Sequence, residues 1–376
     1  MRGGRKYLLL FWLIVLIAPL LQSGFKVFKG GALKGAIIPV PDVEFTLKGW
    51  FDGSYQQGKE EYLNEHFGFR NDLVRLHNQI NFSLFKIASV RDAVVGKENY
   101  LFERKYIEEY YGRNFIGDSA IDRRIFMIQR IADTLNSLNK KLIVVMSPSK
   151  ARFFPEYIPD SLRGPIVPGN YEKYAEGFSR TGIVTMDCNK YFANLRDTCS
   201  YPLFARYGIH WSLYGASFVR DSLLTLIGRV TNKSLPRWDK QFYVSPTPLD
   251  TDNDLGDAMN LIVKLKPGPL AYPTYTLPET VQPVPVRLIS VGDSFYWTMT
   301  SLKIHEALVD DQFWYYNSEV WPPRFGANNN RLTYADLNIK DEIYNNEVFL
   351  LICSEINISN IGFSFVDDAY KLFYGQ

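Results

Sequence analysis

The chain has 376 residues, of which 46% are hydrophobic and 22% are charged. These proportions match those of ordinary folded domains in water and exclude a largely disordered chain. Its 42 basic and 40 acidic residues leave a formal net charge of +2, and no basic run resembles a nucleic-acid-binding stripe. Nucleic acid is therefore not an expected partner.

The first 25 residues have the pattern of a membrane anchor. Arg2, Arg5 and Lys6 precede an apolar run from Tyr7 to Leu21, which approaches the ~20 residues of a membrane crossing when extended to residue 25. The segment after the run lacks an A-x-A-like cleavage site, so we favour an uncleaved signal-anchor over a cleaved signal peptide. Positive residues lie on both sides of the run, and the positive-inside rule does not fix its orientation.

After the anchor, the sequence divides into a lead-in, residues 26–95, and a larger domain, residues 96–376. The lead-in combines a Gly-, Pro- and Lys-rich linker with amphipathic helical stretches. In the domain, helical patterns alternate with five apolar strand segments: KLIVVM, GIVTMD, VRLISV, QFWYY and EVFLLI. Strands of this kind are buried on both faces, so we predict an α/β fold in which helices flank a parallel sheet. A Pro-rich stretch at residues 231–281 is expected to be an insertion.

The insertion contains the acidic segment DTDNDLGDAMNL, which suggests calcium by composition but not by spacing. If Asp250 takes the first position, the glycine comes one residue late and the twelfth position is Leu261 instead of glutamate. We therefore favour a solvated loop and predict no metal site.

The chain has three cysteines, none of them spaced like zinc ligands. Cys188 and Cys199 either form a disulfide in an oxidising compartment or remain two thiols. Cys353 lies in an apolar strand segment, where we expect a small buried residue.

The strongest chemical signal is Gly292-Asp293-Ser294, which follows the strand VRLISV directly and precedes a helical segment. A serine at such a turn presents its hydroxyl at the sheet edge where ligands bind, and its backbone N–H can stabilise an oxyanion. Ser294 is therefore a candidate nucleophile. The alternative is a helix cap, in which Ser294 or Asp293 only satisfies amides of the first turn.

A nucleophilic serine needs a base, and the chain has four histidines. Two of them lie on the amphipathic helices of the lead-in, where packing or surface roles are usual. His305 follows Ser294 by eleven residues, which on a continuous helix separates them by ~16 Å. His210 precedes a helix that Ser212 can cap and is the candidate base. The alternative is a buried histidine packed on Trp211.

The order of these motifs resembles that of a known family. His210 begins an H-W-S-x-x-G motif that precedes the G-D-S motif, as in alginate O-acetyltransferases, whose domain is similar to a circularly permuted SGNH hydrolase. Ordinary SGNH enzymes place the serine first. The segments GKENYLF, SPSKARFFPEYIP and DLGDAMNL are also similar, and the resemblance covers roughly residues 45–360.

The resemblance implies an SGNH-like fold and a transferase of acetyl groups to hydroxyls of an exported cell-surface polysaccharide. Ser294 would form the acetyl-serine intermediate, His210 would be the base, and no cofactor would be needed. The family also implies a membrane-bound O-acyltransferase as donor partner. The domain would be anchored in the inner membrane and face the periplasm or the exterior. Asp293, Asn317 and Arg324 are candidates for oxyanion or substrate contacts.

One position departs from the pattern of the family. The histidine of the family belongs to a D-x-H-W motif, but Gly208 stands where the aspartate is expected. Such a carboxylate is worth about 10⁴-fold in turnover where it alone fixes the imidazole tautomer. Asp187 and Asp293 are possible stand-ins. Three hypotheses stay open: a working acetyltransferase or esterase, a catalytically degenerate member that binds glycan or its membrane partner, and a purely structural membrane-tethered protein. The third has the least support, because it gives no reason for a G-D-S turn together with an H-W motif.

Overall fold

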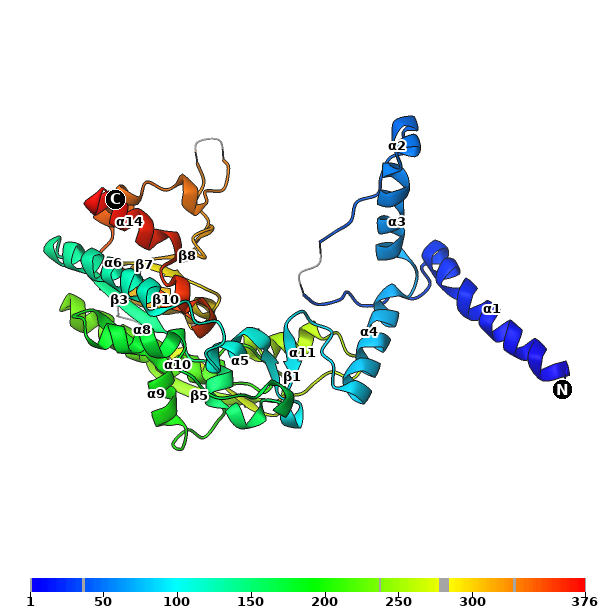
Figure 1. Cartoon of the computed structure of the whole chain (residues 1–376), viewed down its shortest axis with the longest axis horizontal. Helices are drawn as coiled ribbons and strands as arrows, with labels where there is room; N and C mark the ends of the chain where they lie inside the picture. Colours follow the sequence, from blue (N-terminus) through cyan, green and yellow to red (C-terminus); the bar gives the residue numbers. More distant parts are fainter. Residues whose placement is uncertain (1, 36–37, 237, 277–283, 327–328, 376) are drawn as a thin grey trace. The chain divides into compact units, whose positions relative to one another are not determined.

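The computed structural model describes residues 2–35, 38–236, 238–276, 284–326 and 329–375 (Figure 1). The chain divides into two compact units. The first contains Met1–Arg91 and Leu255–Leu265, and the second contains Asp92–Asp254 and Lys266–Gln376. The lead-in expected at residues 26–95 thus ends close to a unit boundary. Residues 255–265, which we expected to belong to the insertion, group with the lead-in instead.

The first unit begins with an apolar helix, α1 (Arg2–Phe25), in which Arg5–Phe25 has a mean hydropathy of 2.2 and is long enough to cross a bilayer. This helix fits a single-pass membrane anchor. Three helices follow along the chain: α2 (Leu47–Asp52), α3 (Ser54–His66) and α4 (Arg70–Ile80). A π-helical turn at Asn81–Phe85 extends α4.

Six strands form the central sheet of the second unit, in the order β4-β3-β10-β7-β8-β9. Five are parallel and correspond to the predicted strand segments: β3 (Lys141–Met146), β4 (Val184–Asp187), β7 (Val284–Gly292), β8 (Leu308–Tyr315) and β10 (Val348–Cys353). The sixth, β9 (Glu319–Trp321), is an antiparallel edge strand. We did not predict β9, because three residues are too few for a periodic pattern.

Alternate residues of the central strands enter two hydrophobic cores on opposite faces of the sheet. In β3, Ile143 and Val145 belong to one core, whereas Leu142, Val144 and Met146 belong to the other. Helices α5 (Arg104–Tyr110), α9 (Cys188–Leu195), α10 (Leu213–Thr231) and α12 (Phe295–Ser301) contribute to the first core. Helices α6 (Asp118–Ser137), α8 (Asn170–Ser179), α13 (Ile339–Asn345) and α14 (Phe363–Tyr374) contribute to the second. Burial on both faces explains why the strand sequences are almost continuously apolar.

Shorter elements complete the fold. Strands β1 (Ala93–Val95) and β2 (Leu101–Glu103) pair antiparallel, and α7 (Lys150–Phe153) follows β3. In the expected insertion, β5 (Asp239–Ser245) pairs with β6 (Leu270–Thr276), and α11 (Asp254–Ala258) comes between them in the chain. Residues 277–281, the end of that insertion, lie outside the described residues. All three cysteines are free thiols, so the pairing of Cys188 with Cys199 is absent from this structure.

Candidate active site

Ser294 stands where β7 turns into α12. Gly292 ends β7 so close to β10 that a Cβ atom would lie 2.6 Å from the Ile352 carbonyl oxygen, which explains the glycine. The buried Asp293 carboxylate accepts hydrogen bonds from the backbone N–H and the hydroxyl of Ser354, at 2.8 and 2.6 Å. Asp293 thus ties the serine turn to the end of β10. These contacts give Asp293 an anchoring role at this turn.

His210 lies in the loop that enters α10. Ser212 caps this helix, because its hydroxyl accepts the Gly215 N–H at 3.0 Å. Trp211 is fully buried, and its indole N–H donates to the Thr298 hydroxyl on α12. The loop is therefore held at both α10 and α12, and His210 is only 8% exposed.

The two predicted residues are in direct contact and share a third partner. His210 Nε2 lies 2.8 Å from Ser294 Oγ, and His210 Nδ1 lies 2.9 Å from Asp254 Oδ2. The other oxygen of this carboxylate, Asp254 Oδ1, accepts the Ile209 N–H at 2.8 Å. A serine, an imidazole and a carboxylate arranged in this order form the relay that activates a serine nucleophile.

Asp254 occupies the place that Gly208 leaves open. A Cβ atom on Gly208 would lie 2.7 Å from the Thr251 carbonyl oxygen, so the acidic loop runs where the side chain of the expected aspartate would begin. The Gly208 carbonyl accepts a hydrogen bond from the buried Lys150 ammonium, which also reaches the Ala205 carbonyl at 3.2 Å. Burial lowers the pKa of Lys150 to about 7. Lys150 therefore anchors the loop before His210.

The carboxylates of the acidic segment interact within the protein. Asp252 accepts the Leu213 N–H at 3.2 Å at the start of α10, and burial raises its pKa to about 7. Asp254 binds His210. Among the described residues, no group of three His, Cys, Asp or Glu side chains is arranged to hold a metal ion. The segment, interpreted from the sequence as a solvated loop, is in part a buried piece of the site.

The other residues considered from the sequence make different contacts. Asn317 has buried amide atoms that form no hydrogen bond with the described residues. Arg324 forms an ion pair with Glu342 at 2.6 Å, which is a structural contact. Asp187 caps α9 by accepting backbone N–H groups of its first turn. Asp254, which we did not single out, takes the position for which Asp187 and Asp293 had been considered.

Tyr316 is a further polar residue at Ser294 that the sequence did not indicate. Its backbone N–H donates to the Gly292 carbonyl at 2.9 Å, and its hydroxyl interacts with Ser294 and Asn357. Burial, reinforced by the charge of Asp293, raises the pKa of Tyr316 to about 12. The phenol therefore keeps its proton at neutral pH and can donate a hydrogen bond at this edge of the sheet.

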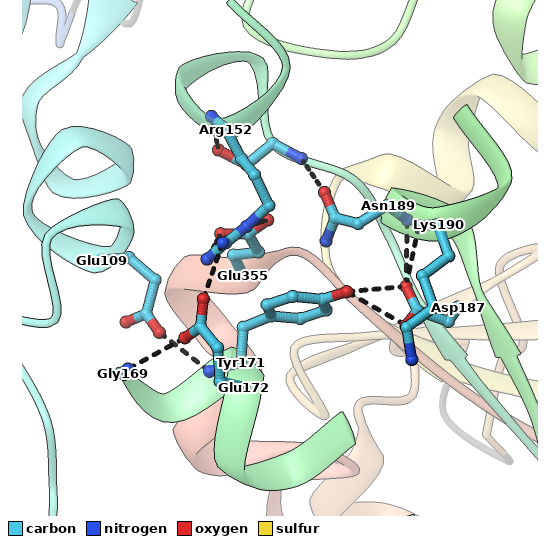
Figure 2. A network of polar contacts seen from close by, with 10 residues as sticks. Glu109, Arg152, Gly169, Tyr171, Glu172, Asp187, Asn189, Lys190 and Glu355 are labelled. Atoms are coloured by element: carbon cyan, nitrogen blue, oxygen red, sulfur yellow. Dashed lines mark hydrogen bonds and ion pairs between the residues drawn. The ribbon is translucent and has the colours of Figure 1, made fainter. Parts of the chain in front are cut away.

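A network of polar contacts joins the segments that follow β3, β4 and β10 (Figure 2). Arg152 binds both carboxylate oxygens of Glu355, at 2.9 and 3.2 Å, and Glu172 at 2.6 Å. The Tyr171 hydroxyl donates to Asp187 at 3.0 Å. Burial raises the pKa of Glu355 to about 7, although Arg152 opposes this shift. Glu355 directly follows the serine that holds the nucleophile turn, so the network stiffens that edge of the sheet.

A parallel sheet with a serine at the end of its central strand β7, in contact with a histidine from the loop before α10, defines an SGNH-like α/β domain. Residues 93–295 match the family described as SGNH hydrolase-like domain, acetyltransferase AlgX, and the chain belongs to that family. The resemblance and the fold class inferred from the sequence motifs are thereby confirmed.

Individual relatives match the chain at low sequence identity or over only part of its length. The chain is 23% identical over 173 residues to a probable alginate O-acetylase AlgJ of Pseudomonas syringae pathovar tomato, covering 46% of this chain and 42% of that relative. The O-acetyltransferase domain of Pseudomonas putida AlgJ is 16% identical, with a TM-score of 0.48 over 71% of this chain and 92% of that chain. Pseudomonas aeruginosa AlgX is 12% identical, with a TM-score of 0.44 over 73% of this chain and 66% of that chain. The family assignment rests on the sequence match to residues 93–295.

Proposed function

We propose that this protein is an O-acetyltransferase that moves acetyl groups onto hydroxyls of an exported cell-surface polysaccharide through an acetyl-Ser294 intermediate. The observation that carries the proposal is the position of His210 between Ser294 Oγ and Asp254 Oδ2, at 2.8 and 2.9 Å. Gly208 was the feature that favoured a degenerate, glycan-binding member. Because Asp254 supplies a carboxylate to the imidazole, that argument loses its basis.

In the proposed mechanism, each residue of the relay has a defined role in acetyl transfer. Ser294 Oγ attacks the acetyl carbonyl of the donor, and His210 Nε2 takes the serine proton. The imidazolium then gives this proton to the leaving group, and acetyl-Ser294 remains. In the second half, the acceptor hydroxyl attacks the acetyl carbon, loses its proton to His210 Nε2 and leaves as the ester, while Ser294 Oγ recovers the proton. Asp254 keeps the Nδ1 proton in place and stabilises the imidazolium.

Two groups are suited to the oxyanion that forms at the acetyl carbonyl. The Ser294 backbone N–H lies at the turn into α12, and the Tyr316 hydroxyl interacts with Ser294. A donor that is fixed before the reaction stabilises the developing charge without further reorganisation. Tyr316 therefore replaces Asn317 and Arg324 as our preferred side-chain candidate for this role.

The family supports the choice of acceptor, and α1 supports a location at a membrane. Relatives are described as an alginate O-acetylase and as acetyltransferases, and these descriptions support a polysaccharide acceptor. The apolar helix α1 supports a membrane tether. The inner membrane and an outward-facing domain, where an exported polymer passes, are what the family resemblance implies. A membrane-bound O-acyltransferase would deliver the acetyl group to Ser294.

The test is acetyl release from a chromogenic acetyl ester by the full chain in detergent, with Ser294→Ala and His210→Ala as variants. Ser301→Ala, at the exposed end of α12, is the matched control. We expect activity in wild type and control, loss in both site variants, and an acetylated Ser294 peptide by mass spectrometry after a brief reaction. Equal rates for wild type and Ser294→Ala, with and without a polysaccharide acceptor, would contradict the proposal.

A further inference from the structure

Within the first unit, the end of the apolar helix α1 packs against the corner between α3 and α4, residues 67–69. The Gly68 N–H in this corner donates to the Ser23 hydroxyl at 2.6 Å. A Cβ atom on Gly68 would lie 2.3 Å from the Pro19 carbonyl oxygen, so the close approach depends on glycine. The Phe28 and Phe69 rings also meet, with 5.7 Å between their centroids. The corner is thus held directly against the last turns of α1.

This contact places the corner at the level of lipid headgroups. The apolar span of α1, Arg5–Phe25, has 21 residues and is therefore about 30 Å long, the thickness of the hydrocarbon core of a bilayer. The corner meets α1 at the end of this span, where acyl chains give way to headgroups. Phe28 is 65% exposed and Phe67 is 39% exposed at this level. Apolar rings are stabilised in the interfacial layer of a membrane.

A cavity of about 540 Å³ lies between the end of α1 and the corner. Its charged lining residues are Lys26, Lys29, Glu65, His66, Arg70 and Asp72. Both carboxylates of the lining have a cation beside them, because Arg70 binds Glu65 at 2.5 Å and Arg75 lies 3.6 Å from Asp72. The negative charge of the cavity is therefore balanced by neighbouring arginines.

The two lysines of the lining have no such partner. The ammonium groups of Lys26 and Lys29 form no hydrogen bond or ion pair within the described residues, and both side chains are exposed. We propose that the cavity binds the phosphate of an anionic lipid headgroup, with Lys26 and Lys29 as its cations. The proposal also explains why positive residues follow the apolar run as well as precede it.

The walls of the cavity favour a lipid over a free phosphate ion. Phe28, Phe67 and Phe69 line it beside the two lysines, so a ligand with an anionic headgroup and apolar chains contacts both parts. Basic residues close to a membrane surface attract anionic lipids over a short range, and the end of α1 keeps these lysines within that range. The bound headgroup would attach the corner, and with it α3 and α4, to the bilayer surface.

The experiment measures binding of a fluorescent phosphatidylglycerol to the full chain in a neutral detergent, with phosphatidylcholine for comparison. The test variant carries Lys26→Gln and Lys29→Gln, and the matched control carries Lys34→Gln and Lys86→Gln. Both control lysines are exposed in the lead-in but lie outside the cavity lining, so the two variants have equal net charge. We expect saturable binding by wild type and control. Binding by the test variant should be at least about 10-fold weaker, because each lysine near an anionic lipid contributes about fivefold.

A further variant, Gly68→Ala, tests the corner itself. Its Cβ would push the corner away from α1, so lipid binding should weaken although no charge is lost. Equal weakening in both lysine variants would show a general charge effect and overturn the site, as would the absence of saturable binding by wild type. Equal affinity for phosphatidylcholine, or displacement of the lipid by millimolar inorganic phosphate, would overturn the assignment to an anionic lipid. None of these measurements depends on the chemistry at Ser294.

Discussion

Replacement of Asp254 by asparagine is the sharpest test of the relay, because the surrounding hydrogen bonds decide how the new side chain must orient. Asp254 Oδ1 accepts the Ile209 N–H, so the amide oxygen of the asparagine will take that position. The amide NH₂ then faces His210 Nδ1 across the 2.9 Å contact. Nδ1 must accept a hydrogen bond, and the imidazole proton moves to Nε2, which can no longer take the proton of Ser294.

We therefore expect Asp254→Asn to lower kcat by about 10⁴-fold, the effect of trapping the wrong tautomer in serine enzymes. At 1.36 kcal/mol for each factor of ten, this is about 5.4 kcal/mol of transition-state stabilisation. KM for the acetyl ester should change little, because the carboxylate contacts the imidazole and not the substrate.

The assay is steady-state acetyl release by the full chain, with Asp250→Asn as control. Asp250 lies in the same acidic loop, is exposed, and has a positive φ of 50° that asparagine accepts. Both variants remove one negative charge from the loop, so a general electrostatic effect would slow them equally. If Asp254→Asn keeps more than about a tenth of wild-type kcat, the carboxylate does not fix the tautomer and the argument is refuted.

Three further predictions concern the surroundings of the relay. Tyr316→Phe should lower kcat by about 10²-fold if its hydroxyl stabilises the oxyanion, and a change confined to KM in steady-state kinetics would refute this role. Gly208→Asp restores the residue expected from the family, but it should lower both activity and Tm, because its Cβ would lie 2.7 Å from a backbone oxygen of the acidic loop. If adding Gly208→Asp to the Asp254→Asn variant restored activity, that result would contradict the steric argument. Arg152→Met should cost about 3–5 kcal/mol of unfolding free energy near pH 8, since it leaves Glu355 buried without its cation. Burial raises the pKa of Glu355 to about 7, above its unfolded value, so the carboxyl becomes protonated as the pH falls. The loss of unfolding free energy caused by Arg152→Met should therefore be smaller near pH 5. Equal losses in urea titrations at pH 5 and pH 8 would contradict this prediction.

The parts of this protein that follow from local sequence were predictable. Each parallel strand is a continuous apolar segment, and Ser294 and His210 each lie at a junction that enters a helix. Local pattern and the order of the two motifs sufficed to identify them as candidates. Their 2.8 Å contact joins residues 84 positions apart, which only the topology of the sheet brings together.

The third member of the relay was not predictable from spacing. Asp254 lies 44 residues after His210, in an insertion whose path no periodicity defines. The family motif places its aspartate two residues before the histidine, so attention went to Gly208 and then to carboxylates at strand ends. The usable signal was the segment DLGDAMNL, which begins at Asp254 and is similar to the family although its carboxylates fail the calcium spacing. Tyr316 was missed for a similar reason, because a tyrosine among strand aromatics resembles core packing.

The steric relation between Gly208 and the acidic loop also constrains how such a site can change over evolution. A side chain at position 208 and the Thr251 carbonyl compete for the same volume, with 2.7 Å between that oxygen and the nearest possible Cβ. The carboxylate can thus come from position 208 or from the loop, but not from both in this backbone. A direct Gly208 to Asp exchange would damage the site, so a change from one arrangement to the other must move the loop before, or together with, the substitution.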